Sequence, residues 1–201
     1  MSEWNAMTFE GKDTILRVVC EQAESMFAMI DDPASWAAPT ACEGWPTRDV
    51  VGHIVDTTEG YFRAFDAARG QGEVQPAHGL TVMADLANQG ATAFRSLSQE
   101  EMVQRLHDDF DKMQGILAPL EAGDWTGMMV THAYMGPVPA FFFAAGQLMD
   151  YGVHSWDLRE GRGMVHARNG DVAEIYVRCP DSRYCRDGSA GTATPPRAGT
   201  E

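Results

Sequence analysis

The stretch from Ala140 to Leu158, AFFFAAGQLMDYGVHSWDL, is apolar on nearly every side when it is drawn as a helix. A helix with that pattern is buried on all sides, so it belongs in the middle of a helical bundle. Asp150 and His154 nevertheless lie within it. Burying such groups is costly unless something compensates them. This stretch therefore predicts both the fold and a place where chemistry could occur.

Other segments with helical character surround this one. Thr14 to Ile30 has apolar residues close to the helical period, and Pro46 to about Arg69 has Pro46 and Asp49 at its start, both typical of a helix N-terminus. Thr81 to Leu97 is a weaker candidate. A capping box at Ser98–Glu101 opens a stretch that ends near Pro119. No strand alternation competes, so we expect an all-α domain with about four long helices.

The length of 201 residues fits one domain of ordinary size. We place the helical bundle at residues 10–165. Residues 177–201 are rich in Arg, Gly, Ser, Ala, Thr and Pro, and large apolar residues are almost missing there after Tyr184. We expect this C-terminal tail to be disordered, because its composition cannot build a core.

The charge and the cysteines limit the class of function. The formal net charge is −14, with no cluster of Lys or Arg. We therefore expect no nucleic-acid partner and no docking to anionic lipid. The longest apolar run, Val138 to Met149, is too short to span a bilayer, and the first ten residues do not form a signal peptide. Four cysteines without a CxxC pair favour a reducing cytoplasm.

Three potential metal ligands occur in two of the predicted helices. Asp150 and His154 are four residues apart and project from the same helical face, and His53 flanks the apolar side of the Pro46–Arg69 helix. Three N/O ligands leave part of a coordination sphere open to water or substrate, as in catalytic zinc sites. Zinc, nickel, iron and manganese all accept such ligands. From spacing alone, structural histidines or a simple Asp–His salt bridge remain alternatives.

The residues around these ligands carry a family resemblance. Cys42-x-Gly44-Trp45-x-x-Arg48-Asp49-Val50-Val51-x-His53 resembles the N-terminal signature of the mycothiol-dependent maleylpyruvate isomerase family, the actinobacterial branch of the DinB-like four-helix bundles. The second signature is similar too, with an acidic residue four positions before the histidine of His154-x-Trp156-Asp157-Leu158. The Gly136-Pro137-x-Pro139 segment also resembles the family. The similarity extends over roughly residues 14–163.

The resemblance implies a divalent metal, usually zinc, held by His53, Asp150 and His154. It also implies a small thiol, typically mycothiol, whose sulfur approaches the open position of the metal. A cation bound to a thiol deprotonates it near neutral pH and makes it a nucleophile. The resemblance thus implies a metal- and thiol-dependent isomerase or S-transferase that acts on a small electrophile. The alternatives are a metal-binding helical module without catalysis and a plain interaction bundle.

Two departures from the family pattern affect the function. Asp150 stands where the family usually has Glu, which is one methylene longer. The isomerases carry a second, C-terminal domain that contributes to the active site, and this chain has the Arg- and Gly-rich tail instead. The resemblance therefore implies metal binding more directly than maleylpyruvate isomerisation itself.

Several neighbours of the candidate ligands have open roles. We expect Trp45 and Trp156 to pack beside the site. Arg48 and Asp157 either orient ligands or substrate, or are solvated surface charges. Cys42 is either a reactive thiol near a helix N-terminus or, as we favour, a small buried apolar residue. His132 is a candidate auxiliary group. Asp56 either supports a ligand through a hydrogen bond or, as we favour, is an exposed helix residue, and the same two roles are open for Glu59.

Overall fold

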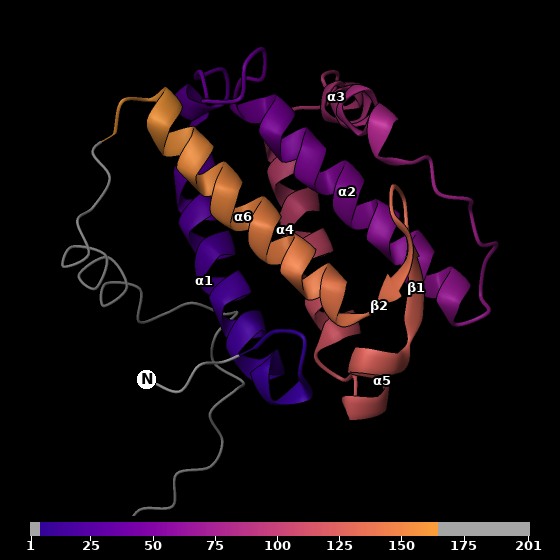
Figure 1. The fold of residues 1–201 in the computed structure, drawn as a ribbon. Coiled ribbons are helices and arrows are strands. Elements are labelled where there is room, and N and C mark those ends of the chain that lie inside the picture. The colour runs from indigo at the N-terminus through magenta and orange to yellow at the C-terminus, as the bar shows by residue number, and fades with distance from the viewer. Residues whose placement is uncertain (1–4, 165–201) are drawn as a thin grey trace, which may run out of the picture. The chain divides into compact units, whose positions relative to one another are not determined.

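The computed structural model describes residues 5–164, and these residues form a mostly helical fold (Figure 1). In chain order the α-helices and strands are α1 (Lys12–Ile30), α2 (Thr47–Ala68), α3 (Met83–Ala93), α4 (Gln99–Leu117), α5 (Ala122–Gly127), β1 (Met129–His132), β2 (Gly136–Pro139) and α6 (Phe141–Gly161). Short 3₁₀ turns occupy Phe9–Gly11, Pro33–Ser35 and Leu80–Val82. The expected tail at 177–201 lies outside the described residues.

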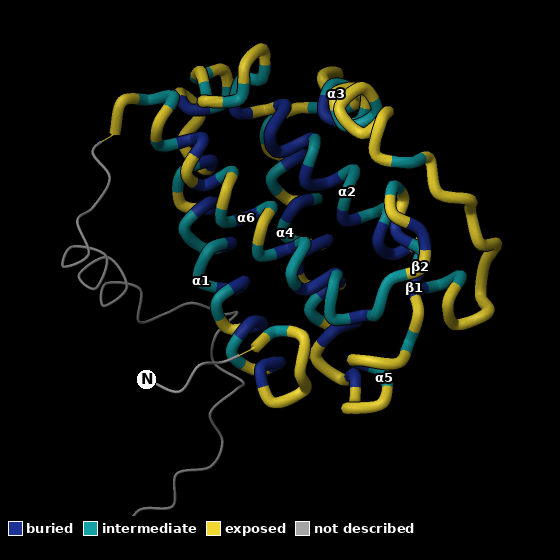
Figure 2. The backbone as a smooth tube through the Cα atoms, viewed as in Figure 1, coloured by how far each residue is buried: buried dark blue, intermediate teal, exposed yellow. Residues whose placement is uncertain are grey.

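The four long helices α1, α2, α4 and α6 form the predicted bundle. Helix α6 packs along α1 and also contacts α2. Helix α4 packs against α2 and lies behind α6 in the view of Figure 1. Buried residues face the spaces between these helices (Figure 2). This arrangement brings one face of α6 along α2, with His154 beside His53 near one end of the contact and Phe143 beside Phe65 near the other. The expectation that the apolar Ala140–Leu158 stretch is buried on all sides is wrong, because Met149, Val153 and Trp156 of α6 are 67%, 50% and 46% exposed and form an outer side of the helix.

Aromatic rings from three helices meet in the core. Phe27 of α1, Phe110 of α4 and Tyr151 of α6 lie edge to face, with ring centroids 5.5 to 6.0 Å apart. This is the geometry that aromatic pairs prefer over flat stacking. Tyr151 is the residue directly after Asp150, so the same packing fixes the part of α6 that carries the candidate ligands.

The helix starts follow their sequence signals closely. Ser98 caps α4 with the full capping box, in which Glu101 bonds back to the Ser98 backbone. Asp49 lies in the first turn of α2, as predicted, but it is also fully buried. Arg95, in the turn after α3, donates from Nε to Asp49 Oδ1 at 3.0 Å and also pairs with Oδ2. This ion pair joins the start of α2 to the end of α3.

The main addition to the all-α prediction is a short antiparallel hairpin. The sequence reads Gly136–Pro139 as a helix breaker, and these residues form β2, paired with β1 through Val130 and Val138. Gly136 has φ 81°, a left-handed conformation that glycine adopts without strain, and it closes the hairpin turn. The hairpin packs on α2 and leads directly into α6.

Two smaller details differ from the sequence-based boundaries. The weak third helix is shorter than Thr81–Leu97, since its ordered helical part is Met83–Ala93 after a 3₁₀ turn. The six-residue helix α5 was not expected. Within residues 5–164, no helix is long and apolar enough to cross a membrane.

Candidate metal centre

Helices α2 and α6 bring the three predicted ligands together. His53 projects from α2, and Asp150 and His154 project from α6 one turn apart. One potential ligand atom of each residue lies within 4.8 Å of the others. The two imidazole rings lie edge to face with centroids 5.1 Å apart. Three donors from two helices therefore converge on a space of the size that one cation fills.

The Asp150 carboxylate is the strongest indication that something is bound here. Its Oδ2 atom is buried and has no hydrogen-bond partner among the described residues. Burial raises the pKa of Asp150 to about 7. A buried carboxylate without a partner is rare, because its desolvation is uncompensated. Two imidazoles and a carboxylate suit a divalent transition metal, so the residues fit the ion that the resemblance implies.

Both histidines are held in the neutral form that binds metals. Burial, together with the neighbouring His154, lowers the pKa of His53 to about 4. Burial also lowers the pKa of His154, and the nearby Asp157 carboxylate opposes that shift in part. Since a neutral imidazole is the form that coordinates metals, these residues need not lose a proton near neutral pH.

Asp157 orients His154. The Asp157 side chain is buried, and its Oδ2 accepts a hydrogen bond from His154 Nδ1 at 2.8 Å. That bond leaves Nε2 of His154 available for coordination. Carboxylate–histidine pairs of this kind fix the tautomer and orientation of metal-bound imidazoles. Of the two roles open for Asp157, the solvated surface charge is wrong.

The Cys42-x-Gly44-Trp45 part of the first motif is a tight turn over the ligands. Trp45 N–H donates to the Cys42 carbonyl at 3.0 Å, and Gly44 adopts φ 80° between them. The turn directs the Trp45 ring to a centroid distance of 5.2 Å from His53 and 6.5 Å from His154. Trp45 therefore packs beside the site, as expected, and its Nε1 donates to Asn88 Oδ1 on α3.

Cys42 is neither fully buried nor purely apolar in its contacts. It is half-buried, and its thiol donates to Asp157 Oδ2 at 3.1 Å, with Sγ 3.8 Å from His154 Nδ1. Burial and the Asp157 carboxylate raise the pKa of Cys42 to about 12. The favoured prediction of a small buried apolar residue is wrong, and the thiol is not activated by its surroundings in the way that a reactive cysteine requires.

A shallow hollow of about 360 Å³ lies on the same turn. It is lined by residues between Ala37 and Pro46, including Cys42 and Trp45. His53, Asp150 and His154 are not part of its lining. The hollow therefore adjoins the candidate metal centre without containing it.

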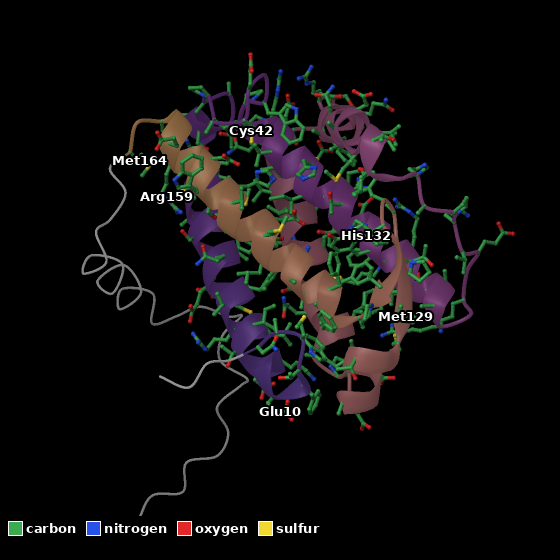
Figure 3. All side chains as sticks on the ribbon, viewed as in Figure 1. Glu10, Cys42, Met129, His132, Arg159 and Met164 are labelled. Atoms are coloured by element: carbon green, nitrogen blue, oxygen red, sulfur yellow. The ribbon has the colours of Figure 1, made fainter. Side chains whose placement is uncertain are left out.

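Other residues singled out in the sequence do not join the site. Trp156 is 46% exposed, so its expected packing role beside the ligands is wrong. Arg48 is an exposed side chain, with its Nε 3.7 Å from Asp49 Oδ1. His132 is the last residue of β1 and so lies in the hairpin, well away from Cys42 near the start of α2 (Figure 3). His132 packs against Tyr61 and the rings of Phe142 and Phe143, which makes it part of the hairpin packing.

The two acidic residues of α2 are only partly exposed. Asp56 lies so close to α3 that a Cβ atom at Gly90 would come within 2.2 Å of its Oδ2. Glu59 accepts a hydrogen bond from Arg105 Nε of α4 at 2.6 Å. Both residues connect α2 to its neighbours, which corrects the exposed position favoured for Asp56.

One sequence signal could have placed Asp157 at the site. Asp157 follows Asp150 by seven positions and His154 by three, which puts all three on one face of a helix. The location of Cys42 has no comparable signal, because it depends on how the turn at Gly44 packs against α6.

The comparison with protein families identifies the bundle. The sequence profile of the mycothiol maleylpyruvate isomerase N-terminal domain matches residues 16–159, which is most of the chain. The chain belongs to this family. The match includes all three candidate ligands, Asp157 and the Cys42–Trp45 turn, so the family assignment and the convergent geometry concern the same residues. No curated protein sequence matches the chain significantly.

Solved structures confirm the fold. A crystal structure of the mycothiol-dependent maleylpyruvate isomerase matches with a TM-score of 0.60 and 17% identity, over 85% of this chain and 69% of that one. The colibactin self-resistance protein ClbS in complex with a double-stranded DNA matches with a TM-score of 0.63 and 12% identity, over 77% and 97% of the two chains. An uncharacterised protein from Clostridium difficile 630 gives a TM-score of 0.63 at 13% identity, over 79% and 99%.

The ClbS structure bears on one expectation from the sequence. We excluded a nucleic-acid partner because of the net charge, yet a protein with this fold was solved with DNA. The exclusion is therefore not supported by the comparisons. The family itself, by contrast, supports the expectation of a small thiol and a small-molecule substrate.

Proposed function

We propose that this protein is a metal- and small-thiol-dependent enzyme, with zinc as the first candidate for the metal and mycothiol for the thiol. Its reaction would be a maleylpyruvate isomerase-like isomerisation or the transfer of the thiol to a small electrophile. His53, Asp150 and His154 would hold the metal. A reducing cytoplasm, which the scattered cysteines favour, would supply such a thiol.

The convergence of three donors, one of them a buried carboxylate oxygen without a partner, is the observation that carries this proposal. Their potential ligand atoms lie within 4.8 Å of one another, and Asp150 Oδ2 has no partner in the described region. A divalent cation in this space supplies Lewis-acid chemistry and favours the thiolate form of a bound thiol. Nickel, iron and manganese accept the same donors, so the metal is tested separately.

The residues of the chain prepare the site in distinct ways. Asp150 supplies the negative charge that offsets part of the cation's charge. His53 and His154 supply neutral nitrogens, and Asp157 holds the His154 ring in place through Nδ1. The Trp45 indole covers the imidazoles on one side and limits the access of water to them. A small electrophile would then approach a partly desolvated nucleophile.

Metal analysis is the first test. Protein purified without a His tag or chelator should contain close to one equivalent of a transition metal per chain. His53→Ala and Asp150→Asn should each bind that metal at least about 100-fold more weakly, while Asp13→Asn, which changes an exposed carboxylate on α1, should keep the wild-type affinity. Metal-free wild-type protein that also fails to bind added Zn²⁺ would sink the proposal and leave an interaction bundle.

A second test separates an enzyme from a metal-binding module without catalysis. Mycothiol added to cobalt-substituted protein should produce a thiolate-to-metal charge-transfer band that depends on His53. Turnover is then measured with maleylpyruvate and with a model electrophile for thiol transfer. Metal binding with neither the band nor turnover would establish the non-catalytic module instead.

A further inference from the structure

A second group of potential ligands lies next to the first. One ligand atom from each of Cys42, His154 and Asp157 falls within a 4.8 Å separation of the others. Cys42 Sγ is 3.1 Å from Asp157 Oδ2 and 3.8 Å from His154 Nδ1. The Cys42 sulfur and an Asp157 carboxylate oxygen thus both lie close to the Nδ1 atom of His154.

The position of the thiol is set by several backbone contacts. The amide of Ala41 donates to the Asp157 carbonyl at 3.0 Å, which ties the Cys42 turn to α6. The Cys42 amide donates to Thr40 Oγ1 at 3.1 Å. A Cβ at Gly161 would lie 2.2 Å from Thr40 Cα, so the helix and the loop are in direct backbone contact. Cys42 is therefore held against His154 and Asp157 by the fold.

We propose that Cys42, His154 and Asp157 form a second cation position that binds a thiophilic divalent ion such as Zn²⁺ or Cd²⁺. Thiolate sulfur, imidazole nitrogen and carboxylate oxygen are all zinc ligands. Coordination requires the thiolate, so binding releases the thiol proton to solvent. The ion takes the place of the hydrogen bonds that Asp157 Oδ2 accepts from Cys42 and His154 in the described structure.

This position is chemically distinct from the His53–Asp150–His154 site, although His154 belongs to both groups. Only the second position has a sulfur ligand, and only the first depends on His53 and Asp150. Two divalent ions sharing one imidazole repel each other, so we expect the wild-type protein to hold about one strongly bound ion. Removing His53 should therefore expose the second position.

The test uses cobalt and cadmium as probes in full-length protein. The background carries Cys179→Ser and Cys185→Ser, which leaves only Cys20 and Cys42 as thiols. In this background His53→Ala should bind one equivalent of Co²⁺ or Cd²⁺ with a sulfur-to-metal charge-transfer absorption. Adding Cys42→Ser should abolish that absorption and weaken binding at least tenfold. Adding Cys20→Ser, on α1, should leave both unchanged.

Asp150→Asn gives a second way to disable the first site if His53→Ala does not fold, as checked by circular dichroism. The same sulfur-to-metal absorption, dependent on Cys42, supports the proposal. An absorption that survives Cys42→Ser, or its absence from both His53→Ala and Asp150→Asn proteins, overturns it. Neither result depends on whether the wild-type protein uses a thiol substrate, so failure here leaves the proposed function standing.

Discussion

Asp49 and Asp150 occupy equivalent places in the two signature motifs, and their surroundings are opposite. Each lies four residues before a histidine on a long helix, Asp49 before His53 and Asp150 before His154. Asp49 is fully buried and paired by the Arg95 guanidinium. Asp150 Oδ2 is buried with no partner in the described region.

The difference lies in which distant segment reaches each carboxylate. Arg95 comes from the turn after α3 and neutralises Asp49, so that the i, i+4 pair with His53 is not formed. The Asp150 carboxylate, by contrast, lies near the imidazole nitrogens of His53 and His154. An aspartate four residues before a histidine thus serves structure in one motif and leaves an unsatisfied charge in the other. Such a charge is the expected mark of a ligand site.

Arg95→Ala should make Asp49 resemble Asp150 and has the largest expected effect on stability. It takes the guanidinium that bonds both oxygens away from a fully buried carboxylate and leaves only the more distant Arg48 Nε, so the free energy of unfolding should fall clearly. Urea denaturation followed by circular dichroism measures this. Arg17→Ala removes an exposed ion pair on α1 and should cost less than about 1 kcal/mol. Equal losses in the two variants would show that the Asp49 pair is energetically ordinary.

Asp150→Asn should have the opposite effect on stability to Arg95→Ala. In metal-free protein the neutral amide removes an uncompensated buried charge, so the free energy of unfolding should stay the same or rise by about 1 kcal/mol. Metal affinity should fall by more than about 100-fold, since outright loss of a ligand exceeds the 10- to 100-fold cost of losing a ligand's supporting partner. Denaturation of chelator-treated protein and competitive Zn²⁺ titration give the two numbers. A marked loss of stability without metal would mean that Asp150 has a structural partner.

Asp109 on α4 extends the comparison to a buried carboxylate outside both motifs. Its Oδ2 has no partner among residues 5–164, and burial, with the nearby Glu59 charge, raises its pKa to about 6. In the unfolded chain it titrates near 3.8. Between these values only the folded protein binds the proton, so stability from this group is lost as the pH rises towards 6.

Asp109→Asn should therefore gain on the wild type as the pH rises from about 4 to 6, by at most about 3 kcal/mol, and the difference should be constant above that range. Urea denaturation at half-unit pH steps measures the difference between the two proteins, in which the contributions of all other titrating groups cancel. A difference that does not change with pH would place Asp109 in contact with solvent.

The contrast between the two aspartates also separates what the sequence could predict from what it could not. The bundle follows from local signals such as the Ser98 cap. The apolar Ala140–Leu158 stretch forms a bundle helix, but one of its sides is exposed at Met149, Val153 and Trp156, which its composition did not predict. The convergence of His53 with Asp150 and His154 was expected from the family resemblance, since spacing along the chain cannot say that α2 lies against α6. The hairpin was missed because Gly136 and Pro137 carry breaker signals, while pairing with β1 is a non-local property.

The contacts of Cys42 and Asp157 were beyond local reasoning for the same reason. Whether Asp157 is a surface charge or a buried acceptor depends on the loop that covers it, and that loop is held by Ala41 and by the close approach at Gly161. Trp156 shows the opposite error, because a large aromatic residue next to His154 points to solvent. Neighbours in sequence on α6 alternate between the site and the surface with the helical period.

The smallest predicted effect concerns the turn that places Trp45 and Cys42 over the ligands. Gly44 has φ 80°, and a Cβ there would meet nothing within 4 Å, so Gly44→Ala costs only backbone strain, about 1 kcal/mol. Gly115→Ala, at an open position in the last turn of α4, makes the same chemical change in helical backbone and should raise stability by up to about 0.8 kcal/mol. Thermal or urea denaturation compares the two. Stability changes of opposite sign would show that the left-handed conformation of Gly44 is the cause. A gain in both variants would mean that the turn at Gly44 relaxes. Trp45 fluorescence should then change, because the indole moves away from His53.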